Sequence, residues 1–207
     1  MRTQRRTLLD NFLFDSVSLM RGDVIDIGGK KENKRGAFRP PKDVSSWEYL
    51  NIDASVNPDY CCSAEDIPVK DCHFDSALMC EVIEHLENPE GVIRESFRIL
   101  KKGGVLILTA PFLYPYHADP YDFQRITDVK LRAMLNKAGF SEIEIRSMGG
   151  TGSVIHDILY VSFSKVKRGS LLLKALKISK PLFLFMDRVL NKSERFITTG
   201  YFVVAKK

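Results

Sequence analysis

One short segment in the middle of the chain constrains the fold most. Residues 105–110, Val-Leu-Ile-Leu-Thr-Ala, carry no charged side chain and end at Pro111. A strand without a polar face must be covered on both sides, and helices on the two faces of a parallel sheet provide that cover. The segment therefore predicts a protein of the α/β class.

Expected strands and helices alternate along the rest of the chain. The connection 30–46 is rich in Lys, Arg and Pro, so any helix in it must be short or irregular. The alternation indicates a mainly parallel sheet. From apolar runs and helical spacing we expect strands at residues 23–27, 49–53, 74–79, 105–110, 143–145 and 200–205, and helices at residues 4–20, 89–100 and 128–138.

Length and composition indicate one domain. The 207 residues are 44% hydrophobic, which is enough to bury a core. The apolar stretch behind the N-terminal arginines is broken by Asp10, Asn11 and Asp15, so we expect no leader segment and a cytoplasmic protein. We expect a single domain over 1–207, with a cofactor-binding core at 21–148, a helical insertion or lid at 149–196 and a final strand at 197–207.

Charge and cysteine content give little support to a nucleic-acid binder, a zinc protein or a disulfide framework. The net charge of +5 comes largely from the two ends of the chain, so it does not by itself predict a nucleic-acid partner. The cysteines have neither C-x-x-C spacing nor a Cys/His finger pattern, and we expect buried, reduced thiols and no metal. They are Cys61, Cys62, Cys72 and Cys80.

A glycine turn and a later acid indicate a nucleotide-type cofactor. Asp26, Gly28 and Gly29 follow the first strand, at the edge where open α/β sheets bind ligands. Asp53 closes the next expected strand, where a carboxylate can accept hydrogen bonds from both ribose hydroxyls. These features alone do not distinguish one nucleotide cofactor from another.

The segment 63–112 makes the distinction, because it resembles class I S-adenosylmethionine-dependent methyltransferases of the type 11 group. Family members share the Glu84-His85 pair, the R-x-L-K-x-G-G pattern at residues 98–104 and Pro111. The resemblance covers roughly residues 22–148. It implies a Rossmann-like three-layer sandwich with a seven-stranded sheet, an antiparallel last strand and a helical insertion before that strand.

The resemblance also implies S-adenosylmethionine as cofactor and S-adenosylhomocysteine as product. In the family, the positions of residues 64–66 contact adenine, and those of residues 80 and 81 border the methionine part. Lys30, Lys31 and Glu32 depart from the family pattern where glycines are expected, and Ser63 replaces a common aspartate. The expected cofactor-binding set is Asp26, Gly28, Gly29, Asn51, Asp53, Ala64, Glu65, Asp66, Cys80 and Glu81.

Two histidines are candidates for the base that deprotonates an acceptor hydroxyl. His117 is our first choice and His85 the second. The pattern H-x-x-P-x-D-x-x-R-x-T at residues 117–127 resembles one in bacterial methyltransferases of surface-polysaccharide pathways. In this interpretation Asp122 belongs to the site and Arg125 binds an anionic acceptor group.

A structural interpretation of the same loop stays open. Asp122 and Arg125 are three residues apart, so they can form a local ion pair that pins the loop, while Thr127 caps the helix that begins at Asp128. His73 and His156 are interpreted as structural or surface residues.

Residues 171–190 place four cationic residues on one arc of a helix, opposite a wide apolar face, and Pro181 should bend that helix. Three interpretations remain: packing on the domain or on a second copy in a homodimer, a lid over an apolar acceptor, and peripheral contact with anionic lipid. The cationic residues are Lys174, Lys177, Lys180 and Arg188.

The leading functional hypothesis is methyl transfer to a hydroxyl of a sugar, of a lipid-linked acceptor or of another small metabolite, without a metal. A nucleic-acid methyltransferase is the rival enzyme, but residues 80–83, Cys-Glu-Val-Ile, lack the N/D-P-P-Y/F signature of base-amine methylation. A non-catalytic module that binds a lipid or a partner protein through the helical insertion is the alternative from another class.

Overall fold

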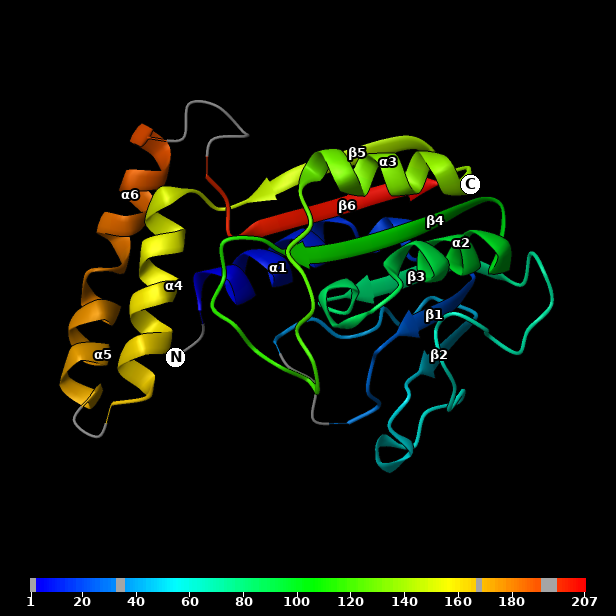
Figure 1. Cartoon of the computed structure of the whole chain (residues 1–207), viewed down its shortest axis with the longest axis horizontal. Helices are drawn as coiled ribbons and strands as arrows, with labels where there is room; N and C mark the ends of the chain where they lie inside the picture. Colours follow the sequence, from blue (N-terminus) through cyan, green and yellow to red (C-terminus); the bar gives the residue numbers. More distant parts are fainter. Residues whose placement is uncertain (1–2, 33–35, 167–168, 191–196) are drawn as a thin grey trace.

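The computed structural model describes residues 3–32, 36–166, 169–190 and 197–207. They form a six-stranded sheet with helices on both faces and a helical unit at one end (Figure 1). The strands are β1 (Asp23–Ile27), β2 (Ser46–Leu50), β3 (Phe74–Cys80), β4 (Leu100–Pro111), β5 (Ser141–Met148) and β6 (Gly200–Lys206). The helices are α1 (Gln4–Asp15), α2 (Pro89–Ile99), α3 (Asp128–Ala138), α4 (Thr151–Ser164), α5 (Gly169–Ile178) and α6 (Lys180–Leu190), with 3-10 turns η1 (Val17–Leu19), η2 (Ala54–Val56) and η3 (Ile83–His85).

The strand order is β2-β1-β3-β4-β6-β5, and β1 to β4 are parallel. β6 runs antiparallel to both β4 and β5, which confirms the antiparallel last strand. The expectation of seven strands is wrong for the described residues. Next to β2 there is only an isolated parallel bridge between Leu50 and Tyr60, and the prolines at 58 and 68 cannot donate to a longer ladder there.

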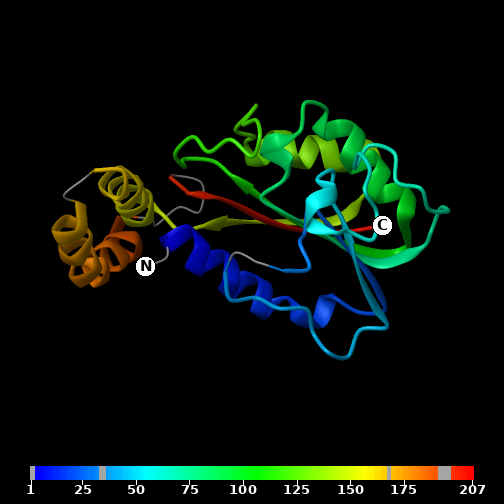
Figure 2. The ribbon, with the colours of Figure 1, turned by 90° about the horizontal axis from the view of Figure 1, so that it is seen from below.

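The two faces of β4 are buried in different layers, as its uncharged sequence predicts. Leu106 and Leu108 pack in the core cluster that includes residues of α2 and α3, whereas Val105 and Ile107 pack with residues of α1. Figure 2 shows α2 and α3 on one face of the sheet and α1 on the other. In the described residues between β1 and β2, 28–32 and 36–45, there is no helix.

Several element boundaries differ from the sequence prediction, and both β4 and β5 are longer than the expected strands at 105–110 and 143–145. The second strand spans 46–50 rather than 49–53, because the side chain of Asn51 turns toward the glycine turn and the Asp53 carboxylate accepts the Ser55 N–H at the start of η2. The opening helix ends at Asp15, where the N–H of Ser16 caps it, and a separate 3-10 turn follows.

The helices between β5 and β6 form a unit at one end of the sheet, beside the N-terminus (Figure 1). The segment 171–190 is not one bent helix but parts of α5 and α6, because Pro181 lies in the first turn of a new helix, where its missing N–H costs nothing. Asp157 of α4 accepts hydrogen bonds from the backbone N–H groups of Gln4 and Arg5, at 2.6 and 2.8 Å. The unit is thereby tied to α1. Among the described helices none is both long and apolar enough to span a membrane.

Candidate active site at the carboxyl ends of β1, β3 and β4

A cavity of about 190 Å³ lies between the glycine turn, the end of β3 and the side of α1. Its volume is below the roughly 300–1,000 Å³ of most small-molecule sites, so it can enclose only part of a nucleoside-containing cofactor. Five residues of the predicted cofactor-binding set line it: Asp26, Gly28, Gly29, Cys80 and Glu81. Arg6 and Asp10 of α1, Lys30 and Asp119 add charged groups to the lining.

The glycine turn has a geometry that favours glycine. Gly28 has φ +77°, and a Cβ there would lie 2.4 Å from the Val82 side chain. Asn51 holds the turn, because its side-chain N–H groups donate to the carbonyls of Gly28 and Gly29 at 3.2 and 3.1 Å. Asn51, predicted to bind cofactor, is therefore engaged in positioning the backbone that lines the cavity.

The remaining predicted cofactor residues lie outside the lining. Asp53 is exposed, and its hydrogen bonds from Ser55 lower the pKa of its carboxyl. Ala64 is buried, while Glu65 accepts a hydrogen bond from Asn88 at 2.6 Å. Asp66 is exposed. Asp53 and Asp66 are both exposed, so a ligand that extends beyond the cavity can reach their carboxylates.

Glu81 is held by a residue that the sequence did not single out. Both carboxylate oxygens accept hydrogen bonds from the Arg5 guanidinium, and one accepts a hydrogen bond from Thr109 at 2.8 Å. Burial alone would raise the pKa of Glu81, but the charge and hydrogen bonds of Arg5 and the hydrogen bond from Thr109 outweigh burial and lower it. Arg5 is 2% exposed and lies 76 positions away in the sequence, so no local signal links the two residues.

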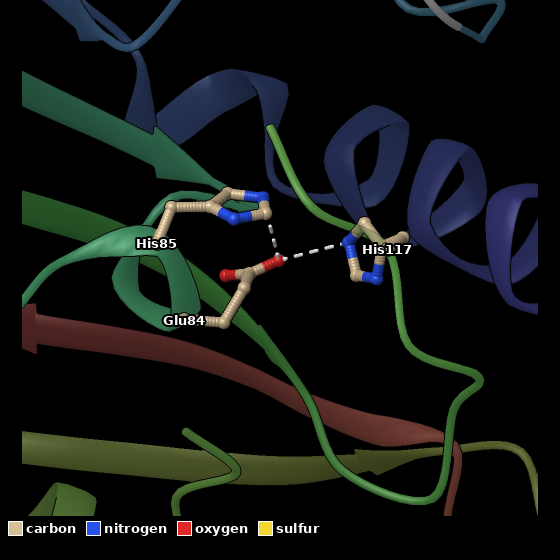
Figure 3. A group of neighbouring side chains, drawn as sticks. All are labelled: Glu84, His85 and His117. Atoms are coloured by element: carbon tan, nitrogen blue, oxygen red, sulfur yellow. Dashed lines mark ion pairs between the residues drawn. The ribbon is translucent and has the colours of Figure 1, made fainter. Parts of the chain in front are cut away.

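Three residues from two separate loops meet beyond the ends of β3 and β4 (Figure 3). Glu84 is buried, and its Oε1 lies 3.7 Å from His85 Nε2 and 3.4 Å from His117 Nε2. The nearby carboxylate of Glu84 raises the pKa of His117, against the opposing effect of burial. The structure thus brings together the two predicted histidines around an acid that we had noted only as part of a family motif.

The loop that carries His117 is pinned by the ion pair that the structural interpretation predicted. Asp122 binds the Arg125 guanidinium through both oxygens and accepts the His117 backbone N–H at 2.9 Å. The hydrogen bonds from Arg125 lower the pKa of Asp122 to about 2. The Thr127 hydroxyl accepts the Lys130 N–H and so caps α3, as expected. The guanidinium of Arg125 is therefore already engaged within the loop.

Other sequence expectations have mixed outcomes. Lys31, which replaces a family glycine, forms an ion pair with Asp59 at 2.6 Å. His156 is fully buried against Asp157, and His73 is exposed. All four cysteines are free thiols, but the expectation that they are buried is wrong for Cys61 and Cys72, which are exposed.

Comparison with known proteins gives a family match and partial relatives. Residues 43–108 match the family model described as Methyltransferase domain. An uncharacterised protein of Methanocaldococcus jannaschii is 48% identical over 44 residues, 21% of this chain and 22% of that protein. The mitochondrial 2-methoxy-6-polyprenyl-1,4-benzoquinol methylase of Caenorhabditis elegans is 29% identical over 93 residues, 45% of this chain and 28% of the enzyme. The chain thus spans about a quarter of the length of these relatives.

Solved structures share the fold over nearly the whole chain. A SAM-dependent methyltransferase from Archaeoglobus fulgidus aligns with a TM-score of 0.58 at 16% identity, over 98% of this chain and 94% of that one. A Haemonchus contortus N-methyltransferase, crystallised with phosphomonomethylethanolamine and S-adenosylhomocysteine, aligns with a TM-score of 0.58 at 13% identity, over 96% of this chain and 52% of that one.

The chain has the fold of a solved SAM-dependent methyltransferase, and one of its segments matches a methyltransferase family model. The segment 43–108 carries the similarity to the Methyltransferase domain family. The expected family resemblance is therefore confirmed. The narrower resemblance to enzymes of surface-polysaccharide pathways stays a prediction.

Proposed function

We propose that the protein binds S-adenosylmethionine and transfers its methyl group to a hydroxyl of a small or lipid-linked acceptor. The observation that carries this proposal is the cavity in which the Gly28–Gly29 turn faces Asp26 and Glu81 at the carboxyl ends of β1 and β3. In open α/β sheets this edge is the ligand-binding edge.

The charges of the lining fit the methionine part of this cofactor. Carboxylates of Asp10, Asp26 and Glu81 suit its ammonium and sulfonium groups, and Arg6 and Lys30 suit its carboxylate. Because the cavity is too small for the whole cofactor, we place the adenosine along the exposed segment that begins at Asp53, whose carboxylate is ionised at neutral pH.

Methyl transfer needs few chemical groups. A lone pair of the acceptor oxygen forms the new C–O bond while the C–S bond breaks, and the electron pair of that bond stays on sulfur in S-adenosylhomocysteine. Holding the three atoms in line and excluding water provides most of the rate enhancement. The proton of the acceptor leaves toward the cluster of Glu84, His85 and His117, with His117 as the first choice of base and His85 as the second.

Two observations favour an apolar or lipid-linked acceptor. The name of the C. elegans relative specifies a polyprenyl benzoquinol. In this chain, α5 and α6 leave apolar side chains exposed, among them Leu171, Ile178 and Phe185 at 74, 82 and 61%. We propose that this surface meets the apolar part of the acceptor.

A pair of glycine variants tests the cofactor site. Gly28 and Gly103 both have φ +77°, but a Cβ at Gly103 has nothing within 4 Å, whereas one at Gly28 meets Val82. The backbone strain of Gly28→Ala and Gly103→Ala is therefore matched. We expect calorimetric titration with S-adenosylmethionine and S-adenosylhomocysteine to show binding that Gly28→Ala weakens at least about 10-fold and Gly103→Ala leaves unchanged.

Asp53→Ala is a second test of the same site. We expect this variant to bind S-adenosylmethionine more weakly, because the ribose hydroxyls lose the carboxylate that accepts their hydrogen bonds. Transfer of a labelled methyl group to a short-chain prenyl hydroquinone then tests the acceptor class. Absence of cofactor binding to the unmodified protein would overturn the proposal and favour the non-catalytic module.

A further inference from the structure

A buried carboxylate without hydrogen bonds marks a second chemical site. Glu84 is 1% exposed, and among the described residues neither of its oxygens has a hydrogen-bond partner. A buried ionised carboxylate is costly unless it is paired, hydrogen-bonded or bound to a metal. The imidazoles of His85 and His117 approach it (Figure 3), and the Arg125 guanidinium lies near enough to interact with its charge.

The tautomers of both histidines direct a lone pair at this carboxylate. His85 Nδ1 lies 2.5 Å from the carbonyl oxygen of Tyr121, and His117 Nδ1 lies 3.3 Å from that of Pro115. A carbonyl can only accept, so in each ring Nδ1 carries the proton. In the neutral rings Nε2 is then unprotonated. This is the arrangement of a metal-binding histidine, whose second nitrogen donates to a backbone carbonyl.

The distances fit a tetrahedral cation between the three groups. With metal–ligand bonds near 2.05 Å, neighbouring ligand atoms of tetrahedral Zn²⁺ lie about 3.3 Å apart. The observed distances from Glu84 Oε1 to the two Nε2 atoms are 3.4 and 3.7 Å, longer than a hydrogen bond. One ligand atom from each residue lies within 4.8 Å of the others. We propose that Glu84, His85 and His117 bind Zn²⁺, with a fourth position for solvent or an acceptor oxygen.

The loop contacts hold these ligands in place without the metal. The Phe123 N–H donates to the Glu84 carbonyl at 2.9 Å, and the Gln124 side chain donates to the Leu86 carbonyl at 2.9 Å. The His117 side chain is 28% exposed, so the site can be reached from solvent on that side. The site is therefore preformed and accessible.

The site has a direct consequence for the proposed function, and this step rests on that function. An acceptor hydroxyl in the fourth position would release its proton to solvent on binding the metal, and the alkoxide would attack the methyl carbon. The two imidazoles then act as ligands rather than as bases. Zinc binding itself does not require S-adenosylmethionine, so the two proposals can fail separately.

Zinc titration of the chelator-treated full chain, without cofactor, tests the site. We expect one Zn²⁺ per chain, and an affinity that falls by more than about 100-fold in Glu84→Gln and His117→Gln. His73→Gln is the matched control, because His73 is exposed and outside the cluster. In the unmodified protein, Co²⁺ should give the intense visible bands of four-coordinate cobalt.

Thermal unfolding separates a zinc ligand from a structural carboxylate. Without metal, Glu84→Gln should unfold at a higher temperature than the unmodified protein, because a buried charge is removed, and Zn²⁺ should raise the midpoint of the unmodified protein only. Unchanged zinc affinity in Glu84→Gln and His117→Gln would overturn the proposal. So would a lower midpoint of metal-free Glu84→Gln, which would show that Glu84 pairs with protonated histidines instead.

Discussion

At the scale of single residues, the pair of Arg5 and Glu81 fixes the floor of the cofactor cavity. Glu81 lines that cavity at the end of β3, and Arg5 reaches it from α1. One guanidinium nitrogen of Arg5, Nη1, is buried without a hydrogen-bond partner in the described structure. Arg5 therefore depends on Glu81 for compensation of its charge, and loss of the carboxylate would leave that charge buried.

Glu81→Gln should lower the free energy of unfolding at pH 7 by about 3 kcal/mol, since it leaves a buried guanidinium without its counter-charge. The pKa of Glu81 is lowered from 4.5 in the folded protein, so its contribution is present above that pH and is lost as the pH falls further. Urea unfolding between pH 7 and pH 3 should give a flatter pH dependence in the variant. Glu144→Gln, at an exposed ion pair, is the control; an equal loss there would contradict the prediction.

At the scale of elements, the loop between β4 and α3 is held by Asp122. Its side chain is 1% exposed and binds both the Arg125 guanidinium and the backbone of His117. Asp122→Asn should lower the free energy of unfolding by about 2 kcal/mol and speed trypsin cleavage after Arg125, because a buried charged pair is broken. Asp71→Asn removes an exposed partner of Arg98 and should have little effect on either measurement. Unchanged cleavage in Asp122→Asn would show that the loop is held by other contacts.

The positions of several helices and strands can be predicted from the sequence. Apolar runs and helical spacing place β1, β3, β4, α2 and α3 within a few residues, because these elements bury one or both faces in the core. The end of β2 was misplaced because the side chains of Asn51 and Asp53 bind neighbouring backbone. The cluster of Glu84 with His117 was not predicted, and no metal was expected, because its residues lie on two loops that only the parallel sheet brings together.

At the scale of the whole molecule, the helical unit lies at one end of the sheet (Figure 1), and its helix α5 exposes both basic and apolar side chains. Lys174 and Lys177 of α5 are exposed beside apolar side chains. In flotation assays we expect binding to vesicles that contain anionic lipid and weaker binding to neutral vesicles, because each lysine near an anionic surface contributes about 1 kcal/mol.

Replacing both lysines by glutamate should reduce vesicle binding at least about 10-fold and leave S-adenosylmethionine affinity unchanged. The exposed pair Lys70 and Lys102, changed in the same way, gives a charge-matched control away from α5 and α6. Equal losses in the two double variants would mean that only net charge, and not this surface, governs the contact.

The anchoring of α1 also bears on the order in which the chain folds. Its residues bind Glu81, 76 positions later, and Asp157, 152 and 153 positions later. Contacts between distant positions slow folding, because the long loops between them must close first. During synthesis, α1 is made before its partners Glu81 and Asp157, because both residues follow it in the chain. The wall that α1 contributes to the cofactor cavity therefore reaches its final contacts only after α4 has been made, long after α1 itself.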